Sequence, residues 1–404
     1  MSWERWNLKQ DPFDPKPLES VEELDNLFVG REGERAELKS VLASPGIRDA
    51  VEADAGVGKT TFVNKVFSEL IRKQAGFLIV PKTIKIESLV AGAEVKCKVA
   101  AELVATLRSQ VDKKHEKIVE KLVDEGRKLE IAIWSSIPLF PIGGSISIKK
   151  EEKLSFGLLS HKAEDIIYKI SDLLPELGFK SAVIAINNLD ALPENSFNEV
   201  LNELRDFIYT PKNISFVLLA NLGFYDFAQS RLPRWEGVLS AFPIQLKKFS
   251  RDEIIEIVER RINFYAVPSQ KPVNPIQDEL MSYLCELADG NLRWVLSTLG
   301  GLAARAPSIE DKITLEIARP ILVNRANQRL ARLTPAEQKI ILALAKYGRE
   351  TYSADKKFQE ISKTSQGGLS QLFTRLESKG ELNKRQDMRK ICYSLIPDYK
   401  ILGG

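Results

Sequence analysis

The chain has 404 residues, 44% hydrophobic and 28% charged, with a formal net charge of +3, a composition ordinary for a soluble globular protein of two or three domains. Its three isolated cysteines and two histidines argue against a disulfide framework, a zinc site and a histidine-based catalytic triad. We expect a cytoplasmic protein with no membrane partner, because the N-terminus lacks a signal-peptide core and no run of about 18 uncharged apolar residues occurs.

The first predicted segment is an N-terminal leader, residues 1–27. Its stretch Asp11-Pro12-Phe13-Asp14-Pro15-Lys16-Pro17 contains X-Pro steps, which disfavour helix, so we expect it to run extended over the surface. The segment Phe28-Val29-Gly30-Arg31-Glu32 then opens a helix that runs to about Leu42.

A phosphate-binding loop is predicted at Ala53-Asp54-Ala55-Gly56-Val57-Gly58-Lys59-Thr60-Thr61. Small residues let backbone N–H groups curl around a β-phosphate, Lys59 reaches the β/γ oxygens, and the Thr60 hydroxyl can ligate Mg²⁺. A short strand candidate precedes the loop. A helix with apolar residues at helical spacing follows it, so the positive end of that helix also faces the phosphates. The chain is therefore predicted to bind ATP or ADP together with Mg²⁺.

A long insertion, residues 86–160, is predicted to interrupt the nucleotide-binding core. A strand around residues 77–80 precedes it, and residues 86–130 are rich in Ala, Lys and Glu, which favours helix. Within residues 131–156, a Gly143-Gly144 turn precedes the alternating Ser145-Ile146-Ser147-Ile148, a pattern typical of a β-hairpin.

The core, residues 28–248, resumes after the insertion with a helix from about His161 to Leu174. Two continuous apolar runs, residues 182–186 and 214–220, predict buried parallel strands, and a helix is expected between them. This alternation of strands and helices predicts an α/β fold built on a parallel sheet.

The first of these two strands ends in Asn187-Asn188-Leu189-Asp190. In P-loop ATPases this place usually carries an Asp that holds Mg²⁺ through water, followed by a Glu that polarises the attacking water. Asn can hydrogen-bond a magnesium-bound water but cannot act as a base. We therefore expect slow or absent hydrolysis, with the nucleotide acting as a conformational switch. The alternative is that Asp190 or Glu194 substitutes and turnover is normal.

Further positions are candidates for action at the γ-phosphate. Asn221 ends the next strand, where it can orient the attacking water or simply cap the strand. Arg231 and the nearby Arg234 lie at an edge from which an arginine can enter a neighbouring subunit's site as an arginine finger, or they are ordinary surface residues. Arg293, in Asp289-Gly290-Asn291-Leu292-Arg293-Trp294, starts a helix and could couple it to the nucleotide.

Two parts complete the chain: a predicted helical lid at residues 249–331 and a terminal domain at residues 332–404. The terminal domain holds 14 basic against 8 acidic residues, and its predicted order is three helices and then a β-hairpin, as in a winged helix-turn-helix. Its third helix would enter the major groove of double-stranded DNA, and its wing would meet phosphates. The DNA-binding candidates are Ser370, Gln371, Thr374, Arg375, Lys384, Arg385, Arg389 and Lys390. A winged helix that binds protein instead is the alternative.

Together these motifs resemble AAA+ ATPases, and among them the origin-recognition and cell-division-control initiators of archaea and eukaryotes. The resemblance covers residues 26–80 and 180–404 and implies an AAA+ core and lid followed by a winged helix. It also implies that the segment of Val29, Gly30 and Arg31 packs on adenine. The leader's start, residues 6–13, looks like that of helper ATPases in DNA transposition. The Asn pair and the insertion depart from the initiator pattern.

We therefore expect an ATP-binding AAA+ protein that engages double-stranded DNA under nucleotide control and recruits or loads a partner protein. Assembly with itself or with a related subunit would use the Arg231/Arg234 edge. Two alternatives stay open. One is a signalling or defence ATPase whose winged helix packs internally as a switch. The other is a transposition-type helper that recruits its partner through the hairpin of residues 131–157.

Overall fold

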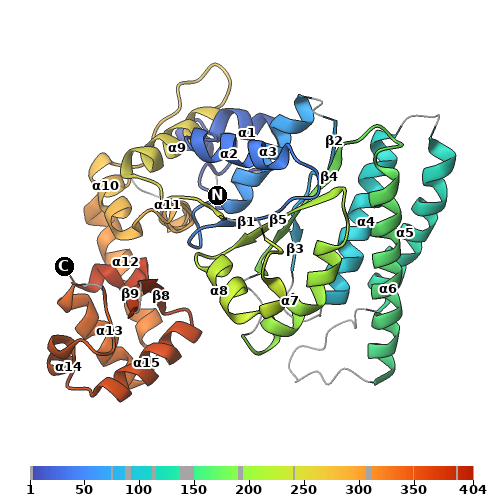
Figure 1. The fold of residues 1–404 in the computed structure, drawn as a ribbon. Coiled ribbons are helices and arrows are strands. Elements are labelled where there is room, and N and C mark those ends of the chain that lie inside the picture. Colours follow the sequence, from blue (N-terminus) through green and yellow to red (C-terminus); the bar gives the residue numbers. More distant parts are fainter. Residues whose placement is uncertain are drawn as a thin grey trace. The chain divides into compact units, whose positions relative to one another are not determined.

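The computed structural model describes residues 3–73, 76–86, 92–111, 115–136, 150–189, 194–239, 242–305, 312–348, 350–387 and 390–403 (Figure 1). The chain divides into two compact units, one of Pro17–Lys247 and the other of Met1–Lys16 together with Lys248–Gly404. None of the helices in the described ranges is both long and apolar enough to cross a membrane.

A parallel sheet forms the centre of the unit Pro17–Lys247. In the described residues its strands are β1 Arg48–Glu52, β2 Phe77–Ile79, β3 Ile84–Lys85, β4 Ser181–Asn187, β5 Ile214–Ala220 and β6 Ile244–Gln245. They run in the order β2-β4-β5-β1-β6, and β3 also pairs with β4. Ala50 lies beside Leu218, and Ile184 beside Phe216, so the carboxyl ends of β1, β4 and β5 meet at one edge.

Helices cover both faces of this sheet because side chains alternate along each strand. On β4, Val183 and Ala185 belong to the core shared with α2 and α3, whereas Ile184 and Ile186 belong to the core shared with α7 and α8. Burial on both faces is why the strands read as continuous apolar runs. The helices outside the insertion are α1 Val21–Leu27, α2 Glu32–Leu42, α3 Lys59–Arg72, α7 Glu194–Tyr209, α8 Phe224–Arg231 and the short 3-10 helix η3 Pro233–Trp235.

Three helices make up nearly all of the described part of the insertion. Its helices α4 Gly92–Gln110, α5 Glu116–Ser136 and α6 Lys150–Leu173 lie side by side next to the sheet (Figure 1). Their apolar faces join the core on the α7 side of the sheet. An ion pair of 2.5 Å between Lys96 Nζ and Glu164 Oε1 also links α4 to α6.

The prediction of a hairpin within residues 131–156 is wrong for the first and last residues of this range, which are helical. Residues 131–136 end α5, and residues 150–156 open α6. The alternating stretch Ser145-Ile146-Ser147-Ile148 lies outside the described residues. α6 begins at Lys150 rather than near His161 because the intervening sequence contains no proline to stop a helix.

The leader packs into the lid in the second unit. The lid helices are α9 Arg251–Phe264, α10 Asp278–Ala288, α11 Leu292–Arg305 and α12 Leu315–Leu330. Trp6, Leu8 and Phe13 are buried in the core that these helices form. Arg261 of α9 also donates hydrogen bonds to two carbonyl groups of the leader.

The predicted leader, residues 1–27, is thus divided between the two units, and the stretch of residues 11–17 is non-helical as expected but buries Phe13 rather than running entirely over the surface. Its first 16 residues belong to the lid's unit. Burial of three large apolar side chains, at roughly 1.5–3 kcal/mol each, favours this packing, which is compatible with X-Pro steps because these only disfavour helix. Residues 17–27 belong to the other unit and contain α1, which Ser20 and Glu23 start as a capping box.

The terminal domain consists of helices around a small antiparallel sheet. Its elements are α13 Pro335–Tyr347, β7 Glu350–Thr351, α14 Lys356–Ser362, α15 Gln366–Ser378, β8 Leu382–Asp387, β9 Lys390–Leu395, α16 Pro397–Lys400 and η4 Ile401–Gly403. The strands pair in the order β7-β9-β8. Phe373 of α15 stacks between Phe358 of α14 and Tyr393 of β9, which fixes α15 against the hairpin.

One helix, α12, belongs to the cores of both the lid and the terminal domain. Ala326 lies in the lid core, and Leu330, one turn later, lies in the terminal core. After the terminal domain the chain folds back onto the lid, where Ile401 is buried in the lid core. Lid and terminal domain are thus packed together along the end of α12.

Charged side chains reinforce this junction. Arg329 of α12 contacts Glu381 Oε2 at 2.7 Å and Asp398 Oδ2 at 3.3 Å, and it donates to the carbonyl oxygen of Gly380 at 3.1 Å. Arg325 reaches Asp398 Oδ1 at 2.9 Å. The Asp398 side chain is only 6% exposed, so its charge depends on these arginines.

We expect Arg329→Ala to lower the free energy of unfolding by about 2 kcal/mol, because it leaves two largely buried carboxylates short of a partner. The effect stays below that of a fully buried pair because the Arg329 side chain is 34% exposed. Urea unfolding measures it, with Arg332→Ala, an exposed arginine three residues on, as the control. Equal unfolding midpoints for the two variants would contradict a role for Arg329 in the junction.

Candidate nucleotide-binding site

The loop between β1 and α3 has the backbone that phosphate binding requires. Gly56 and Gly58 have φ of +83° and +90°, in the left-handed region that favours glycine. Gly58 is the residue before α3, which begins at Lys59. The N–H groups of the first turn of α3 therefore open onto the loop, where an anion is stabilised.

Lys59 joins the loop to the end of β5. Its Nζ donates to the carbonyl oxygen of Ala53 at 2.8 Å and to Asn221 Oδ1 at 3.1 Å. Asn221 directly follows β5, and its side chain is exposed. The structure thus brings together two residues predicted for the site that are 162 positions apart in the sequence.

Asn187 lies at the end of β4 and contacts the loop's threonine. Its Nδ2 donates to Thr60 Oγ1 at 2.8 Å, and its Oδ1 accepts from the N–H of Asn188 at 2.8 Å. Asn188 has φ of +64°, a conformation that Asn tolerates better than most residues. Asp190, the nearest predicted carboxylate, lies outside the described residues, as does the side chain of Glu194.

The donor set fits a nucleotide phosphate well and Mg²⁺ less well. The loop offers N–H groups and one ammonium, whereas in the described residues the side chain that hydrogen-bonds the Thr60 hydroxyl is the amide of Asn187. Mg²⁺ binds mainly through carboxylates, phosphates and water. The Thr60 hydroxyl, and Asn187 through water, are the protein groups that would hold the ion beside the phosphates. In the described part of the chain, no group of three or more His, Cys, Asp or Glu side chains gathers as a metal site.

The segment Val29-Gly30-Arg31 lies next to the loop. Gly30 and Arg31 have φ of +67° and +64°, so the chain turns sharply before α2. The guanidinium of Arg31 donates to the carbonyl oxygen of Val57 at 2.6 Å and to that of Lys247 at 3.4 Å. Arg31 therefore ties this segment to the phosphate loop and to the chain after β6.

A contact between Leu18 and α3 is not predicted by the sequence. The Leu18 N–H donates to Thr61 Oγ1 at 3.2 Å, and the Leu18 carbonyl oxygen accepts from Asn64 Nδ2 at 2.8 Å. The Thr61 hydroxyl thus binds the chain before α1. The only sequence signal is on α3, where Asn64 is a polar residue among the mostly apolar residues 62–67.

The predicted arginines lie in both units. Arg231 is the last residue of α8, and its side chain lies outside the described set. Arg234 is 59% exposed, and its Nη2 lies 2.9 Å from Asp206 Oδ2 of the same chain. Arg293 is in the first turn of α11, in the unit of the lid. Action of these arginines on a nucleotide stays a prediction.

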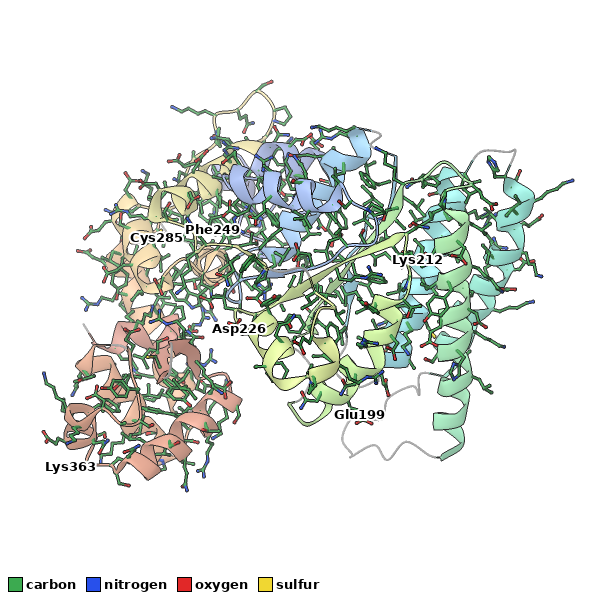
Figure 2. All side chains as sticks on the ribbon, viewed as in Figure 1. Glu199, Lys212, Asp226, Phe249, Cys285 and Lys363 are labelled. Atoms are coloured by element: carbon green, nitrogen blue, oxygen red, sulfur yellow. The ribbon has the colours of Figure 1, made fainter. Side chains whose placement is uncertain are left out.

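The DNA-binding candidates on α15 form one exposed surface. Ser370, Gln371, Thr374 and Arg375 line, with Ser378, an open hollow of about 480 Å³. The Thr374 hydroxyl donates to the carbonyl oxygen of Ser370 at 2.9 Å, so it has already used its proton. Lys363, labelled in Figure 2, precedes this helix at an exposed position.

The wing is only partly described. Lys384 and Arg385 are exposed on β8. Lys390 opens β9, but its side chain is outside the described set, and Arg389 is outside it entirely. The side chains of Lys384 and Arg385 are therefore the wing's described cationic groups.

No protein-family model matches the chain. It is 20% identical over 399 residues to an uncharacterized HTH-type transcriptional regulator of Methanocaldococcus jannaschii, covering 96% of this chain and 90% of that protein. The ORC2 protein of Aeropyrum pernix, in its ADP form, matches with a TM-score of 0.53 and 14% identity over 97% of this chain and 95% of that one. The Walker-type ATPase of Pyrococcus abyssi matches with a TM-score of 0.51 and 15% identity over 97% and 99%.

The chain therefore has the fold of these ATPases over nearly its whole length. This confirms the predicted fold class, an AAA+ α/β core with a helical lid and a C-terminal winged helix. It also confirms, at the level of fold alone, the resemblance to ATPases of the origin-recognition type.

Proposed function

We propose that this protein is an ATP-binding switch of the AAA+ type that binds double-stranded DNA through its terminal domain. The observation that carries the proposal is the meeting of Lys59, Thr60, Asn187 and Asn221 around one left-handed glycine loop. In the proposed roles, residues 28–248 hold the nucleotide, residues 249–331 act as the lid, and residues 332–404 contact DNA.

Nucleotide binding is supported by the chemistry of the loop. Its N–H groups and the Lys59 ammonium can bind a β-phosphate, because both stabilise a negatively charged ligand. The match to an ADP form of an ORC2 protein agrees with this assignment. Val29, Gly30 and Arg31 adjoin the loop, where they would border the adenine.

Slow turnover follows from Asn187 and Asn188. Bound Mg²⁺ would supply charge neutralisation at the phosphates. The chain's own part would be to hold the water near the γ-phosphate with Asn221, but an amide at position 188 has no basic atom to take its proton. We therefore infer that ATP persists on the protein and that its presence, rather than its hydrolysis, sets the state of the lid.

DNA binding is supported by the shape and charge of the terminal domain. The surface of α15 is exposed and rich in hydroxyl and amide groups, which can contact base edges. Lys384 and Arg385 on the wing would contact phosphates. The relative from Methanocaldococcus jannaschii carries the name of an HTH-type regulator, in agreement with this role. Recruitment of a partner protein, and assembly with a second copy or a related subunit through the Arg231/Arg234 edge, are the outputs we propose for the ATP-bound form.

The test is a titration of fluorescent double-stranded DNA at several salt concentrations, with ATP or ADP present. We expect the double change Lys384→Ala with Arg385→Ala to weaken binding and to reduce the salt slope by about 2, roughly 0.9 for each lost phosphate contact. Lys121→Ala with Lys128→Ala, two exposed lysines of α5, is the control with the same change of charge.

Parental DNA binding by the wing variant would contradict the proposed contact surface. A parent protein without salt-dependent affinity for DNA would contradict DNA binding altogether. That second result would favour the internal switch or the transposition-type helper, in which the terminal domain acts on protein.

A further inference from the structure

Glu52 is a buried carboxylate beside the phosphate loop. It is the last residue of β1, is 1% exposed, and lies between Ala220 of β5 and Gln245 of β6. An acid at such a position is costly unless its oxygens are hydrogen-bonded. The neighbouring Ala50, Val51 and Ala53 are buried and apolar, whereas Asp49 is a second buried acid of the same strand.

The oxygens of Glu52 are bound to the turn that follows β5. Oε2 accepts from the N–H of Gly223 at 3.1 Å, and Oε1 accepts from the N–H of Tyr225 at 2.6 Å. Burial raises the pKa of Glu52, and these two N–H groups oppose that rise. Asp226 in the first turn of α8, labelled in Figure 2, raises the pKa further by like charge. The side chain of Gln245 also hydrogen-bonds Glu52 and lowers its pKa.

The same turn carries Asn221. It is held at its start by the sheet, because the N–H of Ala53 donates to the carbonyl oxygen of Ala220 at 3.2 Å. It is held at its end by Glu52, through Gly223 and Tyr225. Asn221, between these two anchors, accepts from Lys59 Nζ at 3.1 Å. One carboxylate therefore connects the strand that leads into the phosphate loop with the turn that presents Asn221.

We propose that Glu52 is a positioning residue that sets Asn221 against Lys59 and thereby lets the site distinguish ATP from ADP. The inference rests on the proposed nucleotide binding and adds to it the means of discrimination. Asn221 can contact a γ-phosphate, which ADP lacks, directly or through water. The loop itself binds the β-phosphate, which both nucleotides carry. Replacement of Glu52 should therefore weaken the binding of ATP and leave the binding of ADP unchanged.

The experiment compares the dissociation constants of Mg-ATP and of ADP for the full chain and its variants. In Glu52→Gln one acceptor oxygen is replaced by an NH₂ group that faces an N–H donor. We expect about tenfold weaker ATP binding with ADP binding unchanged, the loss of one hydrogen bond in a buried network. Asn221→Ala should give a similar loss, and the double variant should lose no more than Asn221→Ala alone, because both changes act through one contact.

Asp226→Asn is the matched control, since it makes the same chemical change one residue beyond Tyr225 at an exposed position, and we expect parental affinity for both nucleotides. Glu52→Asp is a second variant, in case Glu52→Gln folds poorly. It keeps the charge but is too short to hold both N–H groups, so its ATP affinity should also fall.

Additive losses in the double variant, or equal losses for ATP and ADP, would overturn the positioning role and leave Glu52 as a support for α8. A parent that binds neither nucleotide would instead overturn the proposed function. Unchanged ATP affinity in both Glu52→Gln and Glu52→Asp would also reject the inference.

Discussion

Replacement of Lys59 by alanine is expected to weaken binding of both ATP and ADP by about 100-fold or more. Its Nζ is the cationic group that joins Ala53 of the loop to Asn221, and its charge stabilises the phosphates. A hydrogen bond between charged groups in a partly buried site contributes up to about 3 kcal/mol, which corresponds to roughly 100-fold in affinity. Isothermal titration with each nucleotide measures the loss.

Lys73→Ala is the control for this change, because it removes an exposed lysine directly after the same helix. It should bind both nucleotides as the parent does. If Lys59→Ala retained parental affinity, the loop would not be the nucleotide site and the roles proposed for Asn187, Asn221 and the lid would fail with it.

The double change Asn187→Asp with Asn188→Glu is expected to raise ATP turnover by about 100-fold. The new carboxylate at position 187 would accept a hydrogen bond from the Thr60 hydroxyl, where Asn187 now donates one over 2.8 Å, and would add a charge that favours Mg²⁺. A glutamate at position 188 would supply the missing base, an effect of about 10²–10⁴-fold. The gain is limited because position 188 has φ of +64°, which costs a glutamate roughly 1–2 kcal/mol.

Steady-state phosphate release measures this gain, and Asn187→Asp alone should show a smaller one. Adding Lys59→Ala to the double variant should abolish the new turnover, which rules out a contaminating ATPase. Fast turnover by the parent, unchanged by either substitution, would mean that another carboxylate already serves as the base.

Much of the nucleotide core could be predicted from the sequence because its signals are local. The loop's glycines, the apolar runs of β4 and β5, and the polar residues that end them lie within short stretches. Parallel strands bring their carboxyl ends to one edge, so residues that follow different strands meet there. Lys59 and Asn221 do so.

The parts that sequence reasoning missed depend on distant packing. Nothing near Trp6 or Phe13 indicates that a lid more than 230 residues later will bury them, since the X-Pro steps only disfavour helix. The start of α6 is predicted too late because its first turns lack the apolar period of its later ones. Glu52 is an acid directly before the phosphate loop, but only the structure shows that it is buried and which N–H groups it binds.

The return of Ile401 to the core of the lid constrains how this protein can be dissected. A truncation after residue 331 would strip the lid of a buried side chain and leave Leu330, which now lies in the terminal core, facing water. Fragments cut at that point would be poor reporters of what the intact lid does.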